Sequence, residues 1–149
     1  MVPTPSQPGF PTTVLYSASA IASNDVWAVG IGAGTIAEHW DGQQWSIVST
    51  PNPNLQGPSS LNAVVALGPS DVWAAGYTSV NGVSGVTLTE HFDGSTWALV
   101  PTPNRGHNDP SNRLFDIASA GPSGPLWAVG DFTQSFATTP RTLVLTTAS

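Results

Sequence analysis

Two identical pairs of ionisable residues, Glu38-His39 and Glu90-His91, are the first candidates for chemistry in this sequence. A carboxylate and an imidazole can act together in acid–base catalysis or in metal binding. Both pairs lie in stretches that favour strands, where adjacent side chains point to opposite faces of the sheet. One pair therefore cannot close on a single metal ion. A related stretch carries Leu145-Thr146 in the same place, so we expect fixed structural hydrogen bonds from these pairs.

Four aspartates at predicted turns are the second candidates, and they recur as Asp25 with Asp71 and Asp41 with Asp93. Paired carboxylates are the acid and the base of many glycosidases. Residues that occur once in each copy of a repeat, however, lie far apart on the folded molecule, whereas catalytic groups converge at one place. Asp side chains also cap turns by accepting hydrogen bonds from nearby backbone N–H groups. We expect this capping role for all four.

Other catalytic and cofactor-binding patterns are absent from the sequence. It contains no Gly-rich phosphate loop, no Gly-x-Ser-x-Gly nucleophile motif and no His-rich zinc spacing. Because it has no cysteine, disulfides, iron–sulfur clusters, Cys-ligated zinc and a cysteine nucleophile are excluded. The sequence therefore predicts a protein that is not an enzyme, with no catalytic residue, no metal site and no cofactor.

An internal repeat sets the elements that must position these residues. The segment DVWAVG at 25–30 recurs as DVWAAG at 71–76 and as PLWAVG at 125–130, so the three tryptophans are 46 and 54 residues apart. The segment EHWDGQQW at 38–45 recurs as EHFDGSTW at 90–97. Helical repeats are disfavoured because the chain has 15 Gly, 14 Pro and little apolar periodicity of 3.6 residues.

Each repeat resolves into short apolar runs bounded by turn residues. The first runs are 15–21, 61–67 and 114–120, the second carry the Trp-Ala-Val/Ala-Gly core, and the third are 35–40, 87–92 and 142–147. Asp-Gly hairpin turns lead into fourth runs at 45–48 and 97–100. Four antiparallel strands in about 50 residues form the blade of a β-propeller. We predict an all-β propeller segment spanning 1–149, with three blades at about 13–52, 60–104 and 113–149.

These motifs resemble those of kelch-like propellers. Kelch blades carry an aromatic-x-x-Gly-Gly element, a strand that ends in Tyr-Asp, and a Trp that opens the outer strand. The resemblance departs at the double glycine, of which one residue remains in each repeat. It implies structural roles in the blades but leaves function open, because propellers serve as lectins, hydrolases, lyases and adaptors. The matching residues are Trp27, Trp73 and Trp127 for the first element, Asp41 and Asp93 for the second, and Trp45 and Trp97 for the third.

Three blades are too few for a ring, because propellers close with about four to eight. The third repeat has no Trp-led fourth strand, while residues 2–5 (VPTP) match residues 100–103 (VPTP) at the end of an outer strand. Either the third blade is three-stranded or residues 1–5 complete it, as we expect, from a neighbouring copy. Closed symmetry favours a homodimer with six blades, and a homotrimer with nine blades is the runner-up. A fragment of a longer array or of a propeller enzyme is the alternative.

Ligand binding is expected on the irregular loops, since a rigid scaffold usually carries its binding residues there. The loop 104–113 holds two of the three arginines and the one unrepeated histidine, and its donors and acceptors suit a carboxylate, a sugar or a partner loop. Its candidate ligand-binding residues are Arg105, His107, Asp109 and Arg113.

The leading prediction is a non-catalytic, self-assembling scaffold or binding module. The sequence does not identify its ligand, for which a glycan and a protein are the candidates. A carbohydrate-binding propeller that stacks sugars on tryptophan is the alternative. Five of the six tryptophans fall where neighbouring blades should meet, so we expect them to pack in the core.

The overall charge narrows the class of partner. A formal net charge of −6, three arginines and no lysine argue against nucleic acid and against anionic membrane surfaces. No apolar run approaches the roughly 20 residues of a membrane-spanning helix. The Ser/Thr/Pro/Gly-rich composition without cysteine is compatible with a secreted or cell-surface bacterial protein, although the N-terminus shows no signal peptide.

Overall fold

The computed structural model describes residues 2–7, 9–10, 12–53, 57–80, 83–105, 111–133 and 139–147, and these contain eleven strands and no helix. The strands form three antiparallel sheets, which we call blades 1, 2 and 3. Blade 1 contains β1 (Val14–Ala22), β2 (Asp25–Ile31), β3 (Thr35–Trp40) and β4 (Trp45–Val48); blade 2 contains β5 (Ser59–Gly68), β6 (Asp71–Val80), β7 (Val83–Phe92) and β8 (Trp97–Leu99); blade 3 contains β9 (Ser111–Ser119), β10 (Leu126–Thr133) and β11 (Arg141–Thr146).

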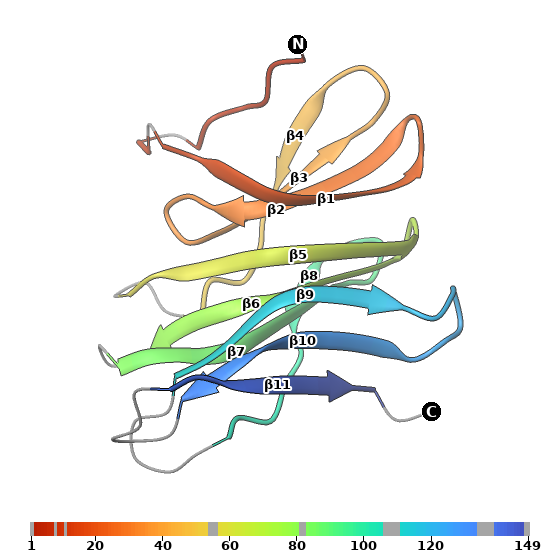
Figure 1. Cartoon of the computed structure of the whole chain (residues 1–149). Helices are drawn as coiled ribbons and strands as arrows, with labels where there is room; N and C mark the ends of the chain where they lie inside the picture. Colours follow the sequence, from red (N-terminus) through yellow and green to blue (C-terminus); the bar gives the residue numbers. More distant parts are fainter. Residues whose placement is uncertain are drawn as a thin grey trace.

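The three blades are stacked in chain order, as Figure 1 shows from top to bottom. Strand β5 of blade 2 packs against β1, β2 and β3, and strand β9 of blade 3 packs against β5, β6 and β7. Each four-stranded blade runs in order from its first strand to its last. This arrangement is a partial all-β propeller. In blade 3 the order is β9, β10, β11, and no fourth strand lies beside β11 among the described residues.

Antiparallel pairing places the repeated motifs at equivalent positions in the blades. Trp27 pairs with His39 between β2 and β3, Trp73 pairs with His91 between β6 and β7, and Trp127 pairs with Thr146 between β10 and β11. Residues that pair across an antiparallel ladder share one face of the sheet. The register therefore defines a forward face of each blade, which carries the motif tryptophan and is turned towards the next blade, and a back face opposite to it.

The glycine that closes each tryptophan motif is required by a close approach of two strands. A Cβ atom at Gly30, Gly76 or Gly130 would lie 1.8–1.9 Å from a backbone carbonyl oxygen of the first strand of the same blade. The pairing of that first strand shifts by one residue beside each of these glycines. The bulge brings the two backbones together, and glycine, which has no side chain, accommodates it.

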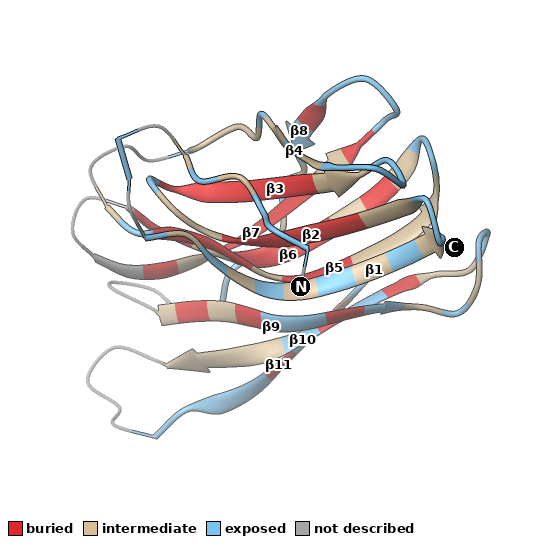
Figure 2. Cartoon of the chain, turned by 90° about the horizontal axis from the view of Figure 1, so that it is seen from above, coloured by how far each residue is buried: buried red, intermediate tan, exposed pale blue. Residues whose placement is uncertain are grey.

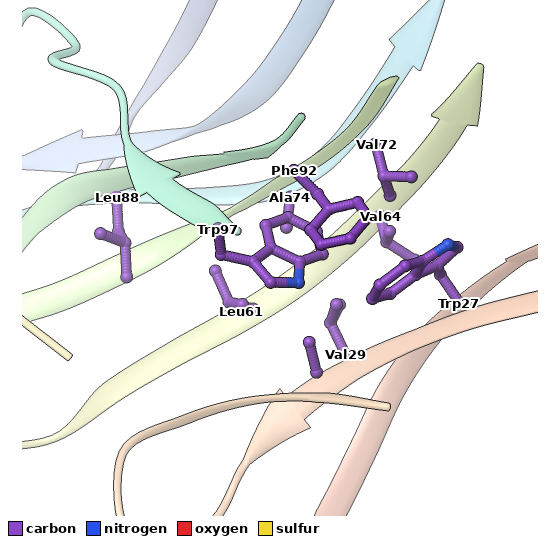
Figure 3. Close-up of a cluster of buried hydrophobic side chains, with 10 residues drawn as sticks. Trp27, Val29, Leu61, Val64, Val72, Ala74, Leu88, Phe92 and Trp97 are labelled. Atoms are coloured by element: carbon purple, nitrogen blue, oxygen red, sulfur yellow. The ribbon is translucent and has the colours of Figure 1, made fainter. Parts of the chain in front are cut away.

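The hydrophobic core lies between blades rather than inside one sheet. Between blades 1 and 2, Trp27 and Val29 of the forward face of blade 1 pack against apolar side chains of blade 2 (Figure 3). The blade 2 residues of this cluster are Leu61, Val64, Val72, Ala74, Leu88, Phe92 and Trp97. A second cluster joins blades 2 and 3 and consists of Ala63, Ala75, Leu114, Ile117, Ala128 and Leu143, with Trp73 and Leu145 partly buried at its margin.

The forward face of blade 3 is open in the chain. Trp127, Val129 and Val144 are 47%, 41% and 51% exposed, whereas the equivalent Trp27 and Val29 of blade 1 are 3% and 0% exposed. Much of β11 is accordingly coloured as exposed in Figure 2. Among the described residues, no blade packs against Trp127, unlike Trp27.

The N-terminal segment does not complete blade 3 within one chain. Residues 2–7 form no strand, and the Gln7 side-chain oxygen accepts a hydrogen bond of 2.8 Å from the Ala33 backbone N–H in blade 1. In Figure 1, residues 2–7 lie beside blade 1 at the top of the stack, whereas β11 belongs to blade 3 at the bottom. Completion of blade 3 by residues 1–5 of a neighbouring copy stays a prediction.

Candidate functional site: blade interfaces and the open edge of blade 3

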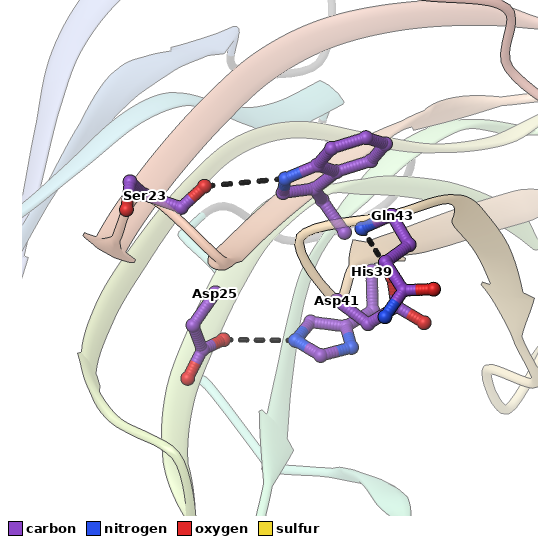
Figure 4. Close-up of polar contacts among 6 residues, drawn as sticks. Ser23, Asp25, His39, Asp41 and Gln43 are labelled. Atoms are coloured by element: carbon purple, nitrogen blue, oxygen red, sulfur yellow. Dashed lines mark hydrogen bonds and ion pairs between the residues drawn. The ribbon is translucent and has the colours of Figure 1, made fainter.

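Each of the first two blades contains an Asp–His pair that joins the starts and ends of neighbouring strands. His39 Nε2 lies 2.8 Å from Asp25 Oδ1 (Figure 4), and His91 Nε2 lies 2.9 Å from Asp71 Oδ1. Each imidazole also lies against the motif tryptophan, with ring centroids 4.6 Å apart for Trp27–His39 and 4.3 Å apart for Trp73–His91. The pairs fix side chains on the forward faces of their blades, as structural hydrogen bonds do.

Asp25 and Asp71 therefore differ from the turn-capping role expected of them. Strand pairing brings a histidine within reach, and Asp71 Oδ1 also accepts a 2.7 Å hydrogen bond from Trp73 Nε1. In blade 3 both members of the pair are replaced together, since Pro125 and Thr146 occupy the equivalent positions. Because the aspartate and the histidine are replaced together in the third repeat, the sequence itself indicates that the two side chains form a pair.

Asp41 and Asp93 sit at the hairpin turns before the outer strands. Asp41 Oδ1 accepts hydrogen bonds of 2.8 Å from the backbone N–H groups of Gln43 and Gln44, and Figure 4 shows the first of these. Asp93 Oδ1 makes the same two bonds with Ser95 and Thr96. The bonds stabilise the charged carboxylates and hold the pKa of both side chains below its ordinary value.

Glu38 and Glu90 are fully buried acidic residues on the back faces of blades 1 and 2. No well-aligned hydrogen-bond donor reaches their carboxylate oxygens in the described part of the chain. Burial raises the pKa of Glu38, and it raises the pKa of Glu90 to about 8, with the Thr35 side chain opposing part of the shift. Burial disfavours the charged form of a carboxyl group, so Glu90 is held largely protonated at neutral pH.

The loop candidates do not gather into one site in the described residues. The Arg113 guanidinium donates to both carboxylate oxygens of Asp131, at 3.2 and 3.1 Å, and it lies over the Phe115 ring at 5.6 Å. Arg105 is tied through its backbone, which exchanges two hydrogen bonds with the buried Asn112 side chain. His107 and Asp109 lie outside the described residues.

The outer-strand tryptophans Trp45 and Trp97 open β4 and β8. Trp45 is half-buried against Trp40, at 5.8 Å between ring centroids. Trp97 is 5% exposed and meets the edge of Trp27 at 5.4 Å, while Phe92 lies 4.6 Å from Trp27. Two aromatic rings of blade 2 therefore seal the forward face of blade 1.

The matching place between blades 2 and 3 is an open groove. Thr147 stands where blade 2 has Phe92, and the described residues of blade 3 include no equivalent of Trp97. Trp73 is consequently only half-buried. The groove has a volume of about 280 Å³ and is mainly apolar, with Trp73, Val100, Pro101, Leu126, Leu145 and Thr147 among its lining residues.

Searches for metal-ligand groups and for membrane-spanning helices give the following findings for the described residues. The His, Asp and Glu side chains of the described ranges form no group of three suited to a metal ion. The same residues include no helix long and apolar enough to cross a membrane.

Comparison with known proteins gives a likeness in structure. No protein-family model matches the sequence, and no curated protein matches it. Among solved structures the chain is similar to YCF48 bound to a D1 peptide, with a TM-score of 0.46 and 15% sequence identity. The likeness covers 95% of this chain, which spans 60% of the length of that chain.

Polar contacts between blades were not anticipated from the sequence. The hydroxyl oxygens of Ser17 and Ser19 in β1 accept hydrogen bonds from the backbone N–H groups of Val64 and Ala66 in β5. The Asn62 amide of β5 donates to the Leu114 carbonyl oxygen in β9, at 2.7 Å. These side chains fix the first strands of successive blades to one another, and small polar residues within otherwise apolar first strands are the signal that marks them.

A second unanticipated contact joins two threonines in each of the first two blades. The hydroxyl oxygens of Thr35 and Thr50 lie 2.9 Å apart, and those of Thr87 and Thr102 lie 2.8 Å apart. Each contact ties the third strand to the segment that follows the outer strand. The recurrence of Thr at both places in the repeat could have revealed it.

Proposed function

We propose that this chain is a non-catalytic β-propeller scaffold or binding module, built of kelch-like blades, that self-assembles into a closed ring. One observation carries the proposal. Trp127, Val129 and Val144 form an exposed apolar face on blade 3, and the equivalent residues Trp27 and Val29 are buried where blade 1 meets blade 2. An apolar face of this kind marks a docking surface when it is exposed on a soluble protein.

The occupant of this face in the proposal is blade 1 of a second copy. The back face of blade 1 carries Trp40 and Trp45, the counterparts of Phe92 and Trp97. In blade 2 that aromatic pair covers Trp27, so Trp40 and Trp45 of another copy are suited to cover Trp127. Two copies joined twice in this way give six blades, which lies in the usual range for a propeller. A trimer of nine blades is the runner-up.

The ring is a scaffold rather than an enzyme in this proposal. The recurring aspartates and histidines are engaged within the blades, in the Asp–His pairs and in the hairpin turns. A glycan or a protein is the proposed class of ligand, and the acidic charge disfavours nucleic acid and anionic membranes.

Light scattering after size exclusion tests the assembly at micromolar concentration. We expect about twice the chain mass of 15.4 kDa for the wild type, and a monomer for Trp127→Ser. Leu99→Ser is the matched control, because Leu99 is 46% exposed but lies on β8, away from the open face. A monomeric wild type would refute the ring, and three times the chain mass would favour nine blades.

A further inference from the structure

Glu90 is a buried acid to which none of the roles described above gives a purpose. It lies on the back face of blade 2, opposite Ala74 of β6 and Leu99 of β8, and it is 0% exposed. The Thr35 side chain of blade 1 is its polar neighbour across the interface. Neither carboxylate oxygen has a well-aligned hydrogen-bond partner in the described part of the chain. The carboxyl group therefore sits between two blades with no group fixed to hold its charge.

The hydroxyl groups beside Glu90 suit a protonated carboxyl group and not an ionised one. Thr50 Oγ1 donates its proton to the Thr35 carbonyl oxygen, at 3.1 Å. A hydroxyl group has one proton, so the 2.9 Å contact between the two hydroxyl oxygens uses the proton of Thr35. Thr35 is then left with lone pairs, which accept a hydrogen bond from protonated Glu90. An ionised Glu90 gains a donor only if Thr35 gives up its bond to Thr50.

Among the described residues, the strands around Glu90 bring no free positive charge to an ionised carboxyl group. On blade 1, Asp25 and His39 lie on the forward face and are bonded to each other at 2.8 Å, while Tyr16 of β1 is exposed to solvent. On blade 2, the described parts of β5, β6 and β8 place no ionisable side chain on the back face, and His91 of β7 points to the opposite face. Ionisation of Glu90 therefore opposes the contact between the blades rather than the strand pairing inside them.

The interface that contains Glu90 is otherwise held by apolar side chains and by two hydrogen bonds between blades, from Val64 and Ala66 to serines of blade 1. We propose that Glu90 is a pH-sensitive switch that opens the interface between blades 1 and 2 when its carboxyl group ionises, while each blade keeps its own strands paired. The interface between blades 2 and 3 carries Leu145 in the same place and so lacks the acid. The switch lies within one chain, so it is independent of the proposed ring.

The direction of the response follows from the two states of the interface. Burial raises the pKa of Glu90 to about 8 when the interface is closed, whereas the carboxyl group returns to its ordinary value of 4.5 when the open interface admits water. The closed state is therefore fully favoured below pH 4.5 and loses this advantage as the pH rises to about 8. The population of the open state should rise about tenfold for each pH unit in this window and level off above it.

Hydrogen exchange measured by NMR on the full chain detects the opening. The backbone N–H groups of Val64 and Ala66 donate to Ser17 and Ser19 across the interface, at 3.3 and 3.0 Å, so they lose these partners when the blades separate. Their protection factors should fall about tenfold for each pH unit from about pH 5 to about pH 8. The amides of β6, which is paired on both sides inside blade 2, should stay more protected at every pH. Equal protection of the two sets would mean that the blades separate only when the whole chain unfolds, and would overturn the proposal.

Two matched substitutions identify the group responsible. Glu90→Gln keeps the size of the side chain but cannot ionise, so the protection of Val64 and Ala66 should no longer vary with pH. Glu38→Gln removes the equivalent acid from the back face of blade 1, which is turned away from blade 2, and should keep the wild-type gradient. Far-UV circular dichroism shows whether each variant folds. A gradient that persists in folded Glu90→Gln, or that disappears in Glu38→Gln, would refute the role of Glu90.

Thr50→Val probes the switch without altering the acid. It frees the proton of the Thr35 hydroxyl group to bond an ionised Glu90, and a donor to the charged form lowers the pKa of the buried carboxyl group. The fall in protection of Val64 and Ala66 should then level off at a lower pH than in the wild type. Levelling off at the same pH or at a higher one would contradict the coupling between Glu90 and the hydroxyl pair.

Discussion

The interface between blades 1 and 2 and the interface between blades 2 and 3 are built from the same motifs but differ in completeness. In the first, Phe92 and Trp97 cover Trp27, which is 3% exposed. In the second, Thr147 replaces the phenylalanine and Trp73 stays half-buried at the margin of the cluster. The fourth strand of a blade therefore serves mainly to seal the contact with the preceding blade, and a blade that lacks it leaves a groove.

The two interfaces also differ in a buried acidic side chain. Glu90 lies in the first interface with its pKa raised to about 8, and Leu145 occupies the same position in the second. The first interface thus combines the better aromatic packing with an acidic group that burial disfavours in its charged form. Separate substitutions of the aromatic residues and of Glu90 should distinguish the contribution of aromatic packing from that of the buried carboxyl group.

The largest expected effect is the pH dependence caused by Glu90. Its pKa is about 8 in the folded chain against an ordinary 4.5, so the folded state holds a proton that the unfolded state releases between these values. The free energy of unfolding should fall as pH rises from 4.5 to about 8, with an upper limit of roughly 5 kcal/mol at 1.4 kcal/mol per unit. Glu90→Gln should remove this slope in urea unfolding at pH 5 to 9.

Glu38→Gln is the matched control for that experiment. Burial also raises the pKa of the Glu38 carboxyl group, which lies in blade 1 at the end of the stack. It should flatten the slope less than Glu90→Gln. A wild-type slope that persists in Glu90→Gln would contradict the assignment.

The second effect is the loss of the aromatic seal in Trp97→Ala, which converts the first interface into the form of the second. The free energy of unfolding should fall by about 3–5 kcal/mol, as for other buried aromatic residues replaced by alanine. Urea unfolding measures the loss, and Trp45→Ala, at a half-buried position, should lose clearly less. Equal losses would mean that burial between blades is not the cause.

The third effect is a graded loss of stability when the motif tryptophan of each blade is replaced by alanine. Trp27→Ala should be as destabilising as Trp97→Ala, Trp73→Ala should cost about 2 kcal/mol, and Trp127→Ala should cost the isolated chain less than about 1 kcal/mol. The order follows the exposure of the three side chains, which rises from blade 1 to blade 3. Urea unfolding at low protein concentration measures the three losses. A different order would show that exposure at the motif position does not set the loss of stability.

The smallest effect concerns the Asp–His pair that blade 3 lacks. His91→Thr and Asp71→Ala should be non-additive by about 1 kcal/mol in a double-mutant cycle, because either change removes the same hydrogen bond. Additive losses would show that the pair makes no coupled contribution.

Much of the architecture could be predicted because local patterns determine it. The Asp-Gly turns and short apolar runs predict the strands, and Trp27 and Trp127 are in the strands expected of them. Their exposure could not be read from the motif, since burial depends on whether another blade packs against that face. Trp127, expected like the other motif tryptophans to face a neighbouring blade, meets no such blade among the described residues.

The candidate site was less predictable because it depends on pairing between strands. The contact between Asp25 and His39 requires the β2–β3 register, and aspartates at a turn have a second common role as caps. The groove beside Trp73 depends on which residues face each other across two blades. The loop with Arg105 and Arg113 stood out by composition, yet the structure places Arg113 in a contact with Asp131.

The difference between the forward and back faces of a blade gives the stack a polarity. Ser17 and Ser19 of β1 accept hydrogen bonds from β5 of the next blade, and Trp27 likewise packs against that blade. Such a contact joins two unlike surfaces, and repeating it produces either a ring or an open helical filament, according to the rotation between neighbours. If the proposed ring closes through this contact, a substitution that alters the angle between blades would convert the ring into a growing fibre.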